Sequence, residues 1–544
     1  MNMIKTADRK RAELASLSRV AACLINEKLV DAAQTDNSTF TITAHPRYRS
    51  NSQSQSHEIV IVHLYKPALF LDTVDPTEIS ADVFWYSNND SKCDKDAKVK
   101  VNDGAALLRI FGKWANIDVE KQCIELENTV ENQERAYKSV PPRFESPAIE
   151  WEQSIVEGIS THPWHKCRYP LVDDFKLAKL HFVAISKGEI KVVGEYDRWI
   201  NQLVVSDGST DDLRNMRDGA EYIILPVHEY QLPVVQKMFP NIRVLPQTIL
   251  GRPQSSLRTI SVPAPRSDFC IKIPLSIKVT SVIRTIKAGD VTIGYNLEPL
   301  LRTFEKAVEA FGGSLIFLHE HAAAASNSEH LGCIIRESIE SVEARTGDRV
   351  IVCAALADHV DSIWDHEQAE VILRQYCQQV FRGLLPSVFR HGFVMQAHQQ
   401  NLLLRIHPVT REIRGIVVRD LGTYKIHLDT FTKSSSFQIE PLLEPGRCES
   451  IERLYERQLI LLHSDVAPII RAFKMEMAGW RIAREELEKV IPRGNDVARK
   501  IWLETPTFPT KSFLSMQLFG FENGIPTPFK ISPNLFYYCQ LKDL

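Results

Sequence analysis

The segment Met395–Gly422 decides the expected fold, and it reads M-Q-A-H-Q-Q-N-L-L-L-R-I-H-P-V-T-R-E-I-R-G-I-V-V-R-D-L-G. Within it, two short apolar runs, Leu402–Ile406 and Ile413–Val418, are separated by a polar linker that contains Pro408. Short apolar runs bounded by proline and polar residues are typical of strands joined by a turn. The segment therefore predicts a β-hairpin.

The polar residues at the open end of this hairpin predict a metal and phosphate site. With a turn midway between residues 410 and 411, Asn401 lies opposite Asp420, and facing residues on paired strands are about 5 Å apart. The amide and the carboxylate can then share one cation, and Mg²⁺ prefers such oxygen ligands together with substrate phosphates. His398 and Arg419 flank the pair and could face a phosphate. An ordinary surface hairpin with polar ends is the alternative.

The composition is that of an ordinary globular protein. The chain has 544 residues, with 44% hydrophobic and 24% charged residues, so we expect about two to four domains. A net charge of -3 gives no indication of a nucleic acid or an anionic membrane as partner. The ten cysteines contain no C-x-x-C and favour free thiols in a reducing compartment. No apolar run approaches the roughly 18 residues that span a bilayer, so we expect a cytoplasmic protein.

A second set of polar residues lies around the segment Ile271–Thr280. Apolar residues at every odd position from 271 to 279 alternate with Lys272, Ser276, Lys278 and Thr280, which predicts a half-buried strand with a basic polar face. Thr280 is then expected to cap a short helix that carries Arg284. Four residues suited to an anion lie near predicted strand ends: Ser256, Arg258, Lys272 and Arg284.

The last third of the chain is predicted to be mostly helical around the hairpin. Apolar spacing of three to four residues favours helices over 337–345, 367–385, 450–462, 466–478 and 481–490. The chain before residue 150 has no catalytic pattern and is interpreted as scaffold.

Motif searches exclude several kinds of active site. The chain contains no G-x-x-x-x-G-K-[ST], no G-x-G-x-x-G and no G-x-S-x-G. What remains is a set of cations, His398 and an Asn/Asp pair suited to a metal, which fits chemistry at the phosphates of a nucleotide. An H-x-x-N followed by D-x-G across a hairpin also resembles the catalytic hairpin of kinase-like phosphotransferases. From the residues alone we predict a magnesium-nucleotide enzyme.

Several ordered motifs between about residues 150 and 520 resemble the NRPS-independent siderophore (NIS) synthetases, the family of the aerobactin, achromobactin and rhizoferrin synthetases. The family's E-G-H-P-x-H-P-x-x-K-x-R segment corresponds to residues 157–168, with His162-Pro163, Lys166 and Arg168 in place. The remaining motifs are P-V-H-E-Y-Q at 226–231, S-L-R-T at 256–259, T-S-V-I-R at 280–284, Q-A-H-Q-Q-N at 396–401, R-D at 419–420 and P-T-K-S-F-L at 509–514.

The resemblance implies an α+β fold with a thumb, fingers and palm architecture, antiparallel sheets and a kinase-like, helix-rich palm. We expect an N-terminal thumb-like domain over residues 1–150, a fingers domain over 151–335 and a palm over 336–544. It implies an AMP-forming ligase that uses ATP and Mg²⁺ to adenylate a carboxylic acid, citrate or a related di- or tricarboxylate. An amine or an alcohol then captures the acyl-adenylate as amide or ester. Family habit suggests a homodimer.

The resemblance also implies roles for individual residues. The ATP-binding residues would be Ser256, Arg258, Lys272, Arg284, His398 and Arg419. The carboxylate substrate would contact His162, Lys166, Thr280, Arg284, His398 and Lys511. Magnesium would be held by Asn401, Asp420 and the position of Gln396, and the catalytic residues would be Arg284, His398 and Lys272.

Two departures from the family pattern bear on these roles. Gln396 stands where the family has a carboxylate, which leaves Asp420 as the one anionic metal ligand. Ile159-Ser160 replaces the first H-P of the family segment, so the identity of the acid is open. Two other classes stay open: a kinase-like phosphotransferase and a catalytically silent, nucleotide-binding relative.

Overall fold

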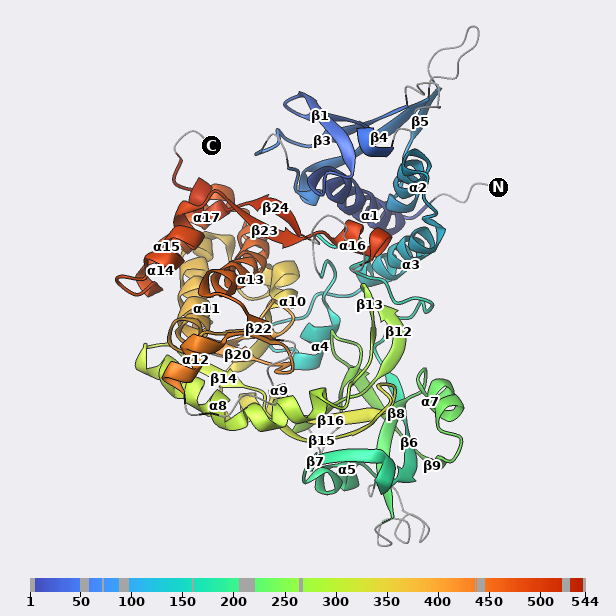
Figure 1. The fold of residues 1–544 in the computed structure, drawn as a ribbon, viewed down its shortest axis with the longest axis vertical. Coiled ribbons are helices and arrows are strands. Elements are labelled where there is room, and N and C mark those ends of the chain that lie inside the picture. The colour runs from blue at the N-terminus through green and yellow to red at the C-terminus, as the bar shows by residue number, and fades with distance from the viewer. Residues whose placement is uncertain are drawn as a thin grey trace.

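The computed structural model describes residues 5–48, 58–70, 73–87, 97–158, 161–204, 221–263, 268–435, 437, 446–520 and 529–541. Its N-terminal part is a five-stranded antiparallel sheet with three helices packed beside it (Figure 1). The strands are β1 (Val30–Asp36), β2 (Thr39–Ala44), β3 (Ile59–Leu64), β4 (Ile79–Ser87) and β5 (Ala97–Lys100). The helices are α1 (Ala7–Asn26), α2 (Gly104–Ala115) and α3 (Glu120–Tyr137). Thr6 and Asp103 cap α1 and α2, since each side chain accepts a hydrogen bond from a backbone N–H of the first turn.

An eight-stranded sheet forms the next part of the chain, in the order β7-β15-β16-β11-β10-β9-β6-β8. Its strands are β6 (Ala178–Ser186), β7 (Ile190–Gly194), β8 (Tyr222–His228), β9 (Arg243–Pro253), β10 (Thr259–Ser261), β11 (Phe269–Lys272), β15 (Glu320–Ser326) and β16 (Gly332–Glu337). Helices α4 (Ala148–Gln153), α5 (Tyr196–Val204) and α7 (Leu232–Met238) belong to the same stretch. Strand β11 pairs with β10 on one side and with β16 on the other, both antiparallel, so it is a central strand of the sheet. Lys272 is its last residue.

The predicted continuous strand through Lys272 is wrong. It is divided into β11, which lies in the large sheet, and β12 (Leu275–Val279), which pairs with β13 (Val282–Arg284) in a separate two-stranded ribbon. Pro274 separates the two strands, and a proline has no N–H to donate to a sheet. The predicted alternation does hold within β12, whose odd positions are buried and whose even positions are half-buried.

The helix predicted to carry Arg284 is also wrong. Thr280 and Ser281 form the turn of the ribbon, with Thr280 at φ 62, and Arg284 pairs with Leu275 as part of β13. Thr280 is therefore a turn residue and not a helix cap. Its backbone N–H donates to the carbonyl of Cys167 at 3.1 Å, which attaches the ribbon to the loop that contains Cys167.

The predicted hairpin is present as β19 (Leu402–Ile406) and β20 (Ile413–Val418), with the bounds expected from the sequence. It forms a four-stranded sheet with β14 (Leu315–Phe317) and β17 (Arg349–Val352). Helices α8 (Asp290–Ala310), α9 (Ile339–Thr346), α10 (Cys353–His359) and α11 (Ala369–His391) pack around it (Figure 1). Strands on either side of the hairpin in the chain form a three-stranded sheet: β18 (Phe393–Met395), β21 (Tyr424–His427) and β22 (Arg447–Cys448). Helix α12 (Leu428–Ser434) lies between β21 and β22 in the chain.

The C-terminal part is helical, with one difference from the prediction. Residues 450–462 and 466–478 do not form two helices: α13 (Ile451–Ala472) is continuous and contains Pro468. The remaining elements are α14 (Glu476–Val490), α15 (Asp496–Arg499), β23 (Thr507–Lys511), α16 (Phe513–Phe519), β24 (Phe529–Pro533) and α17 (Leu535–Tyr538).

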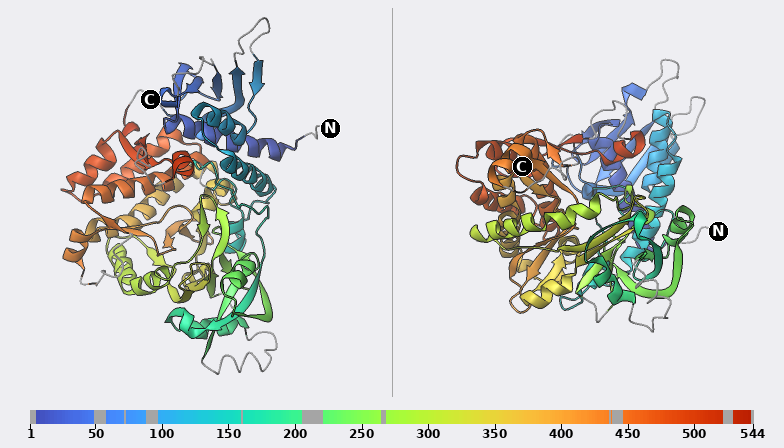
Figure 2. Two further views of the ribbon diagram at one scale, coloured as in Figure 1. Left: turned by 45° about the vertical axis from the view of Figure 1, so that its right-hand side comes forward. Right: turned by 60° about the horizontal axis from the view of Figure 1, so that its bottom comes forward.

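Three large clusters of buried apolar residues correspond to the N-terminal part, the eight-stranded sheet and the helical part. Chain segments cross between these clusters. Trp151 packs in the helical core, whereas Trp164 and Leu514 pack in the N-terminal core. Figure 2 shows from two further sides that the C-terminal α16 lies against the N-terminal part, where Glu27 accepts hydrogen bonds from the N–H groups of Leu514 and Ser515. The predicted domain bounds stay a prediction.

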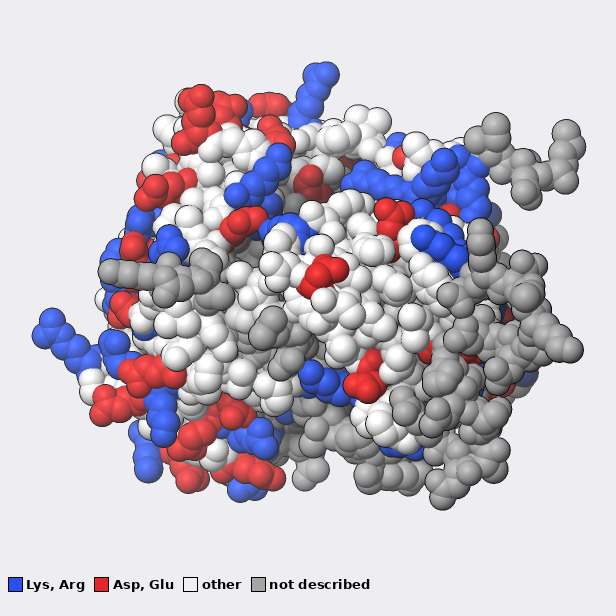
Figure 3. Space-filling model, turned by 90° about the horizontal axis from the view of Figure 1, so that it is seen from above, with Lys and Arg blue, Asp and Glu red and all other residues white. Residues whose placement is uncertain are grey.

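The surface carries both signs of charge. On the face seen from above in Figure 3, acidic and basic side chains are interspersed over the described residues. Among those residues, no helix is both long and apolar enough to cross a membrane. The overall fold is α+β, with mostly antiparallel pairing and the parallel exceptions β14–β20 and β21–β22.

Candidate active site

A cleft of about 1750 Å³ brings most of the predicted site residues together. Its lining includes nine of them: Lys166, Ser256, Arg258, Thr280, Arg284, Gln396, His398, Asp420 and Lys511. The other four, His162, Lys272, Asn401 and Arg419, are buried beside the cleft and are not part of its lining. Residues from all three parts of the chain therefore surround one space.

The turn before β19 holds His398 and Asn401 in one local structure. The N–H groups of Asn401 and Leu402 both donate to the carbonyl of His398, at 2.7 and 2.9 Å. The Asn401 amide Nδ2 donates to the carbonyl of Gln396 at 3.1 Å, which leaves its Oδ1 as the atom suited to a metal. Three predicted site residues are thus fixed by backbone contacts.

The predicted register of the hairpin is wrong by one residue. Leu402 pairs with Val418, and the N–H of Arg419 donates to the carbonyl of Asn401 at 3.1 Å, so Asn401 lies opposite Arg419. The cause is the position of the turn, because Ile406 pairs with Ile413 and the turn is therefore centred between Val409 and Thr410; a bulge at Arg405/Ile406, with one extra residue on β20, then shifts the pairing one residue back toward the predicted register. Asp420 follows the end of the strand at φ 67.

Lys272 and Asp420 form an ion pair between the eight-stranded sheet and the hairpin. Burial by itself would raise the pKa of the Asp420 carboxyl, but the positive charges of Lys272, Arg258 and Arg336 lower it far below its usual range. Asp420 is therefore an anion at any physiological pH. Among the described residues, no group of three His, Cys, Asp or Glu side chains could hold a metal, so a cation here needs further ligands.

His398 is neutral near pH 7. Burial is the largest cause that lowers its pKa to about 4; the Asp420 carboxylate opposes this, and the charges of Lys511, Arg419 and Arg284 add to it. A neutral imidazole can donate one hydrogen bond to an anion without adding charge.

Two arginines line the cleft from neighbouring elements. Arg258 follows the turn at residues 255–257 and donates to the carbonyl of Thr285, next to Arg284. Burial and then the charge of Arg258 lower the pKa of Arg284 to about 10, so both guanidinium groups are close and charged at neutral pH. Two adjacent cations in a partly buried cleft favour the binding of an anion.

The loop that precedes Arg258 is held by its own side chains. Ser256 Oγ donates to Thr259 Oγ1 at 2.9 Å and accepts from the N–H of Thr259 at 3.2 Å. Leu257 adopts φ 64, so the chain turns sharply at this point.

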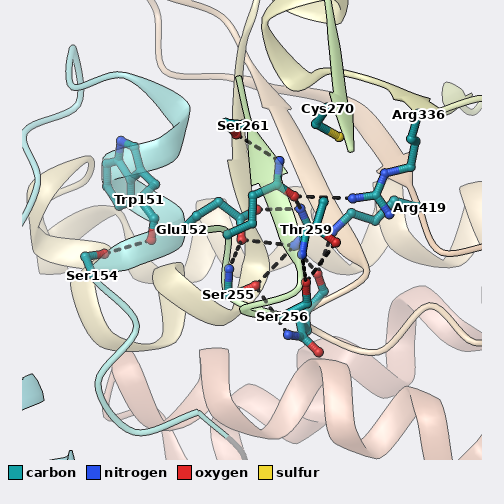
Figure 4. A network of polar contacts seen from close by, with 12 residues as sticks. Trp151, Glu152, Ser154, Ser255, Ser256, Thr259, Ser261, Cys270, Arg336 and Arg419 are labelled. Atoms are coloured by element: carbon teal, nitrogen blue, oxygen red, sulfur yellow. Dashed lines mark hydrogen bonds and ion pairs between the residues drawn. The ribbon is translucent and has the colours of Figure 1, made fainter. Parts of the chain in front are cut away.

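Arg419 is bonded to protein groups rather than facing the cleft. It forms a buried ion pair with Glu152 of α4 at 2.6 Å, and it donates to Gln254 and to the carbonyl of Gln400 (Figure 4). Glu152 also accepts from the N–H of Ser255 at 3.0 Å. The pair therefore joins the β19–β20 hairpin to the loop that carries Ser256 and Arg258.

His162 is likewise bonded within the protein. Its Nδ1 accepts from the N–H of Trp164 at 3.0 Å, so the proton lies on Nε2, which contacts Ser281 Oγ at 2.5 Å. Burial, with smaller contributions from nearby cations, lowers its pKa to about 3. His162 thus supports the turn of the β12–β13 ribbon. Ile159 and Ser160, the departure from the family segment, lie outside the described residues.

Lys166 and Lys511 lie at the cleft from two further directions. Lys166 donates to the carbonyl of Ile155 at 2.5 Å, and burial, followed by the charge of Arg168, lowers its pKa to about 8. Lys511 ends β23, and burial, Arg457 and Lys425 lower its pKa.

Sequence reasoning missed several residues at this site. Lys425, Arg457 and Lys530 also line the cleft, and Glu152 holds Arg419. The signal for Glu152 was its place beside Trp151 on the buried face of a short helix, where a charge needs a partner.

The chain is similar to known proteins in sequence and in fold. Residues 147–358 match the IucA/IucC family, and residues 373–524 match a second family, described as ferric iron reductase FhuF-like transporter. The predicted resemblance to the NIS synthetase family is confirmed by the first match and by the relatives of the chain. One such relative is the NRPS-independent siderophore synthetase rfs of Rhizopus delemar, 27% identical over 418 residues. That alignment covers 69% of this chain and 64% of the relative.

Two solved structures share the fold. The petrobactin biosynthesis protein AsbB from Bacillus anthracis superposes with a TM-score of 0.78 at 18% identity and covers 98% of this chain and 97% of its own. The ATP-bound aerobactin synthetase IucA from Klebsiella pneumoniae has a TM-score of 0.72 at 15% identity and covers 96% and 99%. The likeness in fold covers 96–98% of this chain and therefore includes the N-terminal part.

Proposed function

We propose that this chain is an ATP-dependent ligase of siderophore or related natural-product biosynthesis. In this proposal it adenylates a carboxylic acid, citrate or a related di- or tricarboxylate, and joins the acyl group to an amine or an alcohol. The observation that carries the proposal is the convergence of Arg258 and Arg284 with the neutral His398 on one cleft, beside the ion pair of Lys272 and Asp420.

The donor groups fit magnesium as part of a nucleotide complex. Asp420 offers a carboxylate and Asn401 an amide oxygen, while Gln396 adds no charge. Mg²⁺ is usually bound by one or two protein groups together with substrate phosphates, and this set matches that habit. When bound, the metal would neutralise phosphate charge.

In the first step, a carboxylate oxygen of the acid attacks the α-phosphorus of ATP, and the bond to pyrophosphate breaks. Two anions must approach each other, so cations that cancel their repulsion lower the barrier. We assign Arg284 to this position between acid and α-phosphate, with Arg258 and Ser256 on the phosphates. Lys511, Lys166 and Thr280 line the side of the cleft assigned to the acid.

His398 donates a hydrogen bond to the developing charge in this proposal. Because its pKa is about 4, the imidazole stays neutral and does not compete with the arginines for the anions. In the second step, the nucleophile attacks the acyl carbon, AMP leaves with the former carboxylate oxygen, and the nucleophile loses a proton.

Two predicted site residues take supporting roles. Arg419 and His162 are hydrogen-bonded to protein groups, so we assign Arg419 to holding the Ser255–Arg258 loop and His162 to holding the ribbon turn. The thumb, fingers and palm division, the kinase-like palm and the homodimer are further parts of the proposal.

The test is an assay of activation. The protein is incubated with ATP, Mg²⁺, hydroxylamine and a panel of di- and tricarboxylic acids, and hydroxamate, pyrophosphate and ADP are measured. Acid-dependent hydroxamate with pyrophosphate release is the expected result. Release of ADP instead would identify a phosphotransferase. Absence of both products, with no rise in melting temperature on adding ATP and Mg²⁺, would reject a nucleotide enzyme.

A further inference from the structure

The ion pair of Lys272 and Asp420 joins two residues that the family resemblance gives to different ligands. Lys272 would bind ATP and Asp420 the metal, yet the Lys272 ammonium contacts Oδ1 of Asp420 directly. Lys272 is the last residue of β11 and is buried, whereas Asp420 follows the hairpin of the helical part. The ammonium thus occupies an oxygen of the carboxylate that the proposed function gives to the metal.

The surroundings make this carboxylate a poor site for a free divalent cation. The charges of Arg258 and Arg336 act on Asp420 in addition to that of Lys272. Arg336 is buried on β16, and its guanidinium donates to Gln254 at 3.3 Å. The charge of the buried Glu320 offsets part of that of Arg336. Lys272 and Arg258 remain as cations that act on the carboxylate, and a dication that approaches it meets their repulsion, which low-dielectric surroundings strengthen.

The residue at position 396 also makes the site unfavourable for a free divalent cation. Gln396 lines both the cleft and a small pocket that Asp420 also lines. A carboxylate at this position would give a dication a second anionic ligand before any phosphate arrived. The amide does not, so the protein offers the metal one anionic group, and that group is already paired.

We propose that Lys272 acts as a tethered counter-cation that occupies Asp420 until a nucleotide binds, so that the metal enters this site only together with the triphosphate. The inference rests on the proposed function, specifically on the nucleotide and metal site at Asp420. When the triphosphate arrives, the Lys272 ammonium transfers from the carboxylate to a phosphate oxygen. Asp420 is then free, and the phosphates supply the missing anionic ligands.

The experiment measures binding of Mn²⁺, as a probe for Mg²⁺, to the full-length protein without nucleotide. Protein-bound Mn²⁺ is determined by equilibrium dialysis and by loss of the free-ion EPR signal. Wild type is expected to show no site that depends on Asp420. Lys272→Met is expected to gain one such site, with an affinity at least about 10-fold higher than wild type, equivalent to ~1.4 kcal/mol. The double variant Lys272→Met/Asp420→Asn is expected to lose it.

The matched control is Lys278→Met. Lys278 lies on the next strand, β12, and is also ion-paired, but its partner is Glu125 at 2.5 Å and it donates to Gln517 rather than to the hairpin. This variant is expected to bind Mn²⁺ as wild type does. An equal affinity in wild type and Lys272→Met, with both variants folded by circular dichroism, would overturn the proposal.

A second measurement uses wild type alone and does not depend on a variant folding. Calorimetry with α,β-methylene-ATP, which cannot be cleaved at the α-phosphate, is expected to show nucleotide binding in EDTA and metal binding only after the nucleotide. Metal binding to the nucleotide-free wild type as tight as in the presence of the nucleotide would refute the exchange and leave the proposed function standing. No nucleotide binding under any metal condition would overturn the proposed function itself, and the exchange with it.

Discussion

Two hairpins carry the candidate site, and they are held in different ways. In β19–β20 every residue is buried except Arg405 and Arg414, and the sheet continues on both sides. In the β12–β13 ribbon, Val282 and Ile283 are 49% and 55% exposed, and among the described strands the ribbon pairs with no other. The β19–β20 hairpin is thus part of the large helical core, whereas only the odd positions of β12 are buried in the ribbon, in a small separate cluster.

The ribbon is attached by a small apolar cluster, in which Leu275, Ile277 and Val279 of β12 pack with Phe175 and Leu257, and by polar contacts. Gln231 accepts from the N–H of Ser276 at 2.6 Å, Lys278 pairs with Glu125, and His162 contacts Ser281. Hydrogen bonds of this kind contribute about 1 kcal/mol each, much less than burial of a whole strand. Substitutions in the β19–β20 hairpin are therefore expected to abolish turnover, and substitutions around the ribbon are expected to reduce it partially.

The largest effect is expected from Asp420→Ala. The substitution removes the one anionic metal ligand and leaves the buried Lys272 without its partner. We expect turnover to fall by about 10³-fold or more, because each preorganised charge at a reacting phosphate contributes on the order of 10²–10³. Pyrophosphate release measures it, and Asp429→Ala, an exposed change on α12, serves as control. Turnover near the wild-type rate would remove Asp420 from the metal site.

A smaller loss is expected from Arg284→Ala, about 10²–10³-fold in kcat/KM for the acid. Arg284 is assigned to both the acid and the α-phosphate, so the acid dependence of pyrophosphate release should weaken together with the rate. Arg284→Lys should restore part of the rate, since the charge returns without the planar guanidinium. Val282→Ser, an exposed change on the same strand, should leave the kinetics unchanged. Normal kinetics in Arg284→Ala would show that the ribbon does not carry the bridging cation.

The two hairpins also differ in how far the sequence predicted them. The arms of β19–β20 have the predicted bounds, because short apolar runs between polar linkers are a strong local signal. Its predicted register was wrong because the turn is centred at Val409 and Thr410 rather than at Thr410 and Arg411, and nothing in the pattern marks the bulge near Arg405. For the ribbon, Pro274 was visible, but the alternation on both sides of it concealed the break.

Contacts between segments that are distant in the sequence account for the features of the site that were not predicted. The motifs placed nine predicted site residues on one cleft. Yet Arg419 pairs with Glu152 across 267 residues, and His162 with Ser281 across 119. A periodic pattern reports which face of an element is buried and carries no information on which partner a buried charge meets. The resemblance to a family suggested which residues belong to the site. Only the fold distinguishes the residues that line the cleft from those, such as Arg419 and His162, that are hydrogen-bonded to other protein groups.

An intermediate effect, on stability, is expected from His162→Gln. The pKa of His162 in the folded protein is about 3, below its ordinary value near 6.5, so the unfolded chain binds a proton that the folded one does not. The contribution of His162 to the free energy of unfolding is therefore fully present above pH 6.5 and is lost as the pH falls toward 3, by up to about 1.4 kcal/mol per pH unit. Glutamine offers a neutral donor and acceptor, so the variant should lose less stability between pH 7 and 5. Urea unfolding at several pH values measures the slope, and identical slopes would contradict the assigned neutral state.

The smallest effect is expected from Gln396→Glu, which places a second carboxylate near Asp420. The change should lower the Mg²⁺ concentration needed for half-maximal pyrophosphate release several-fold, on the order of 10-fold or less, because added ligand charge tightens metal binding. It should also weaken the dependence of metal binding on nucleotide, since Lys272 cannot neutralise two carboxylates at once. Gln368→Glu, an exposed change outside the lining of the cleft, controls for added charge. An unchanged Mg²⁺ requirement in Gln396→Glu would place position 396 outside the metal's reach and leave the hairpin's Asn401 and Asp420 as its protein ligands.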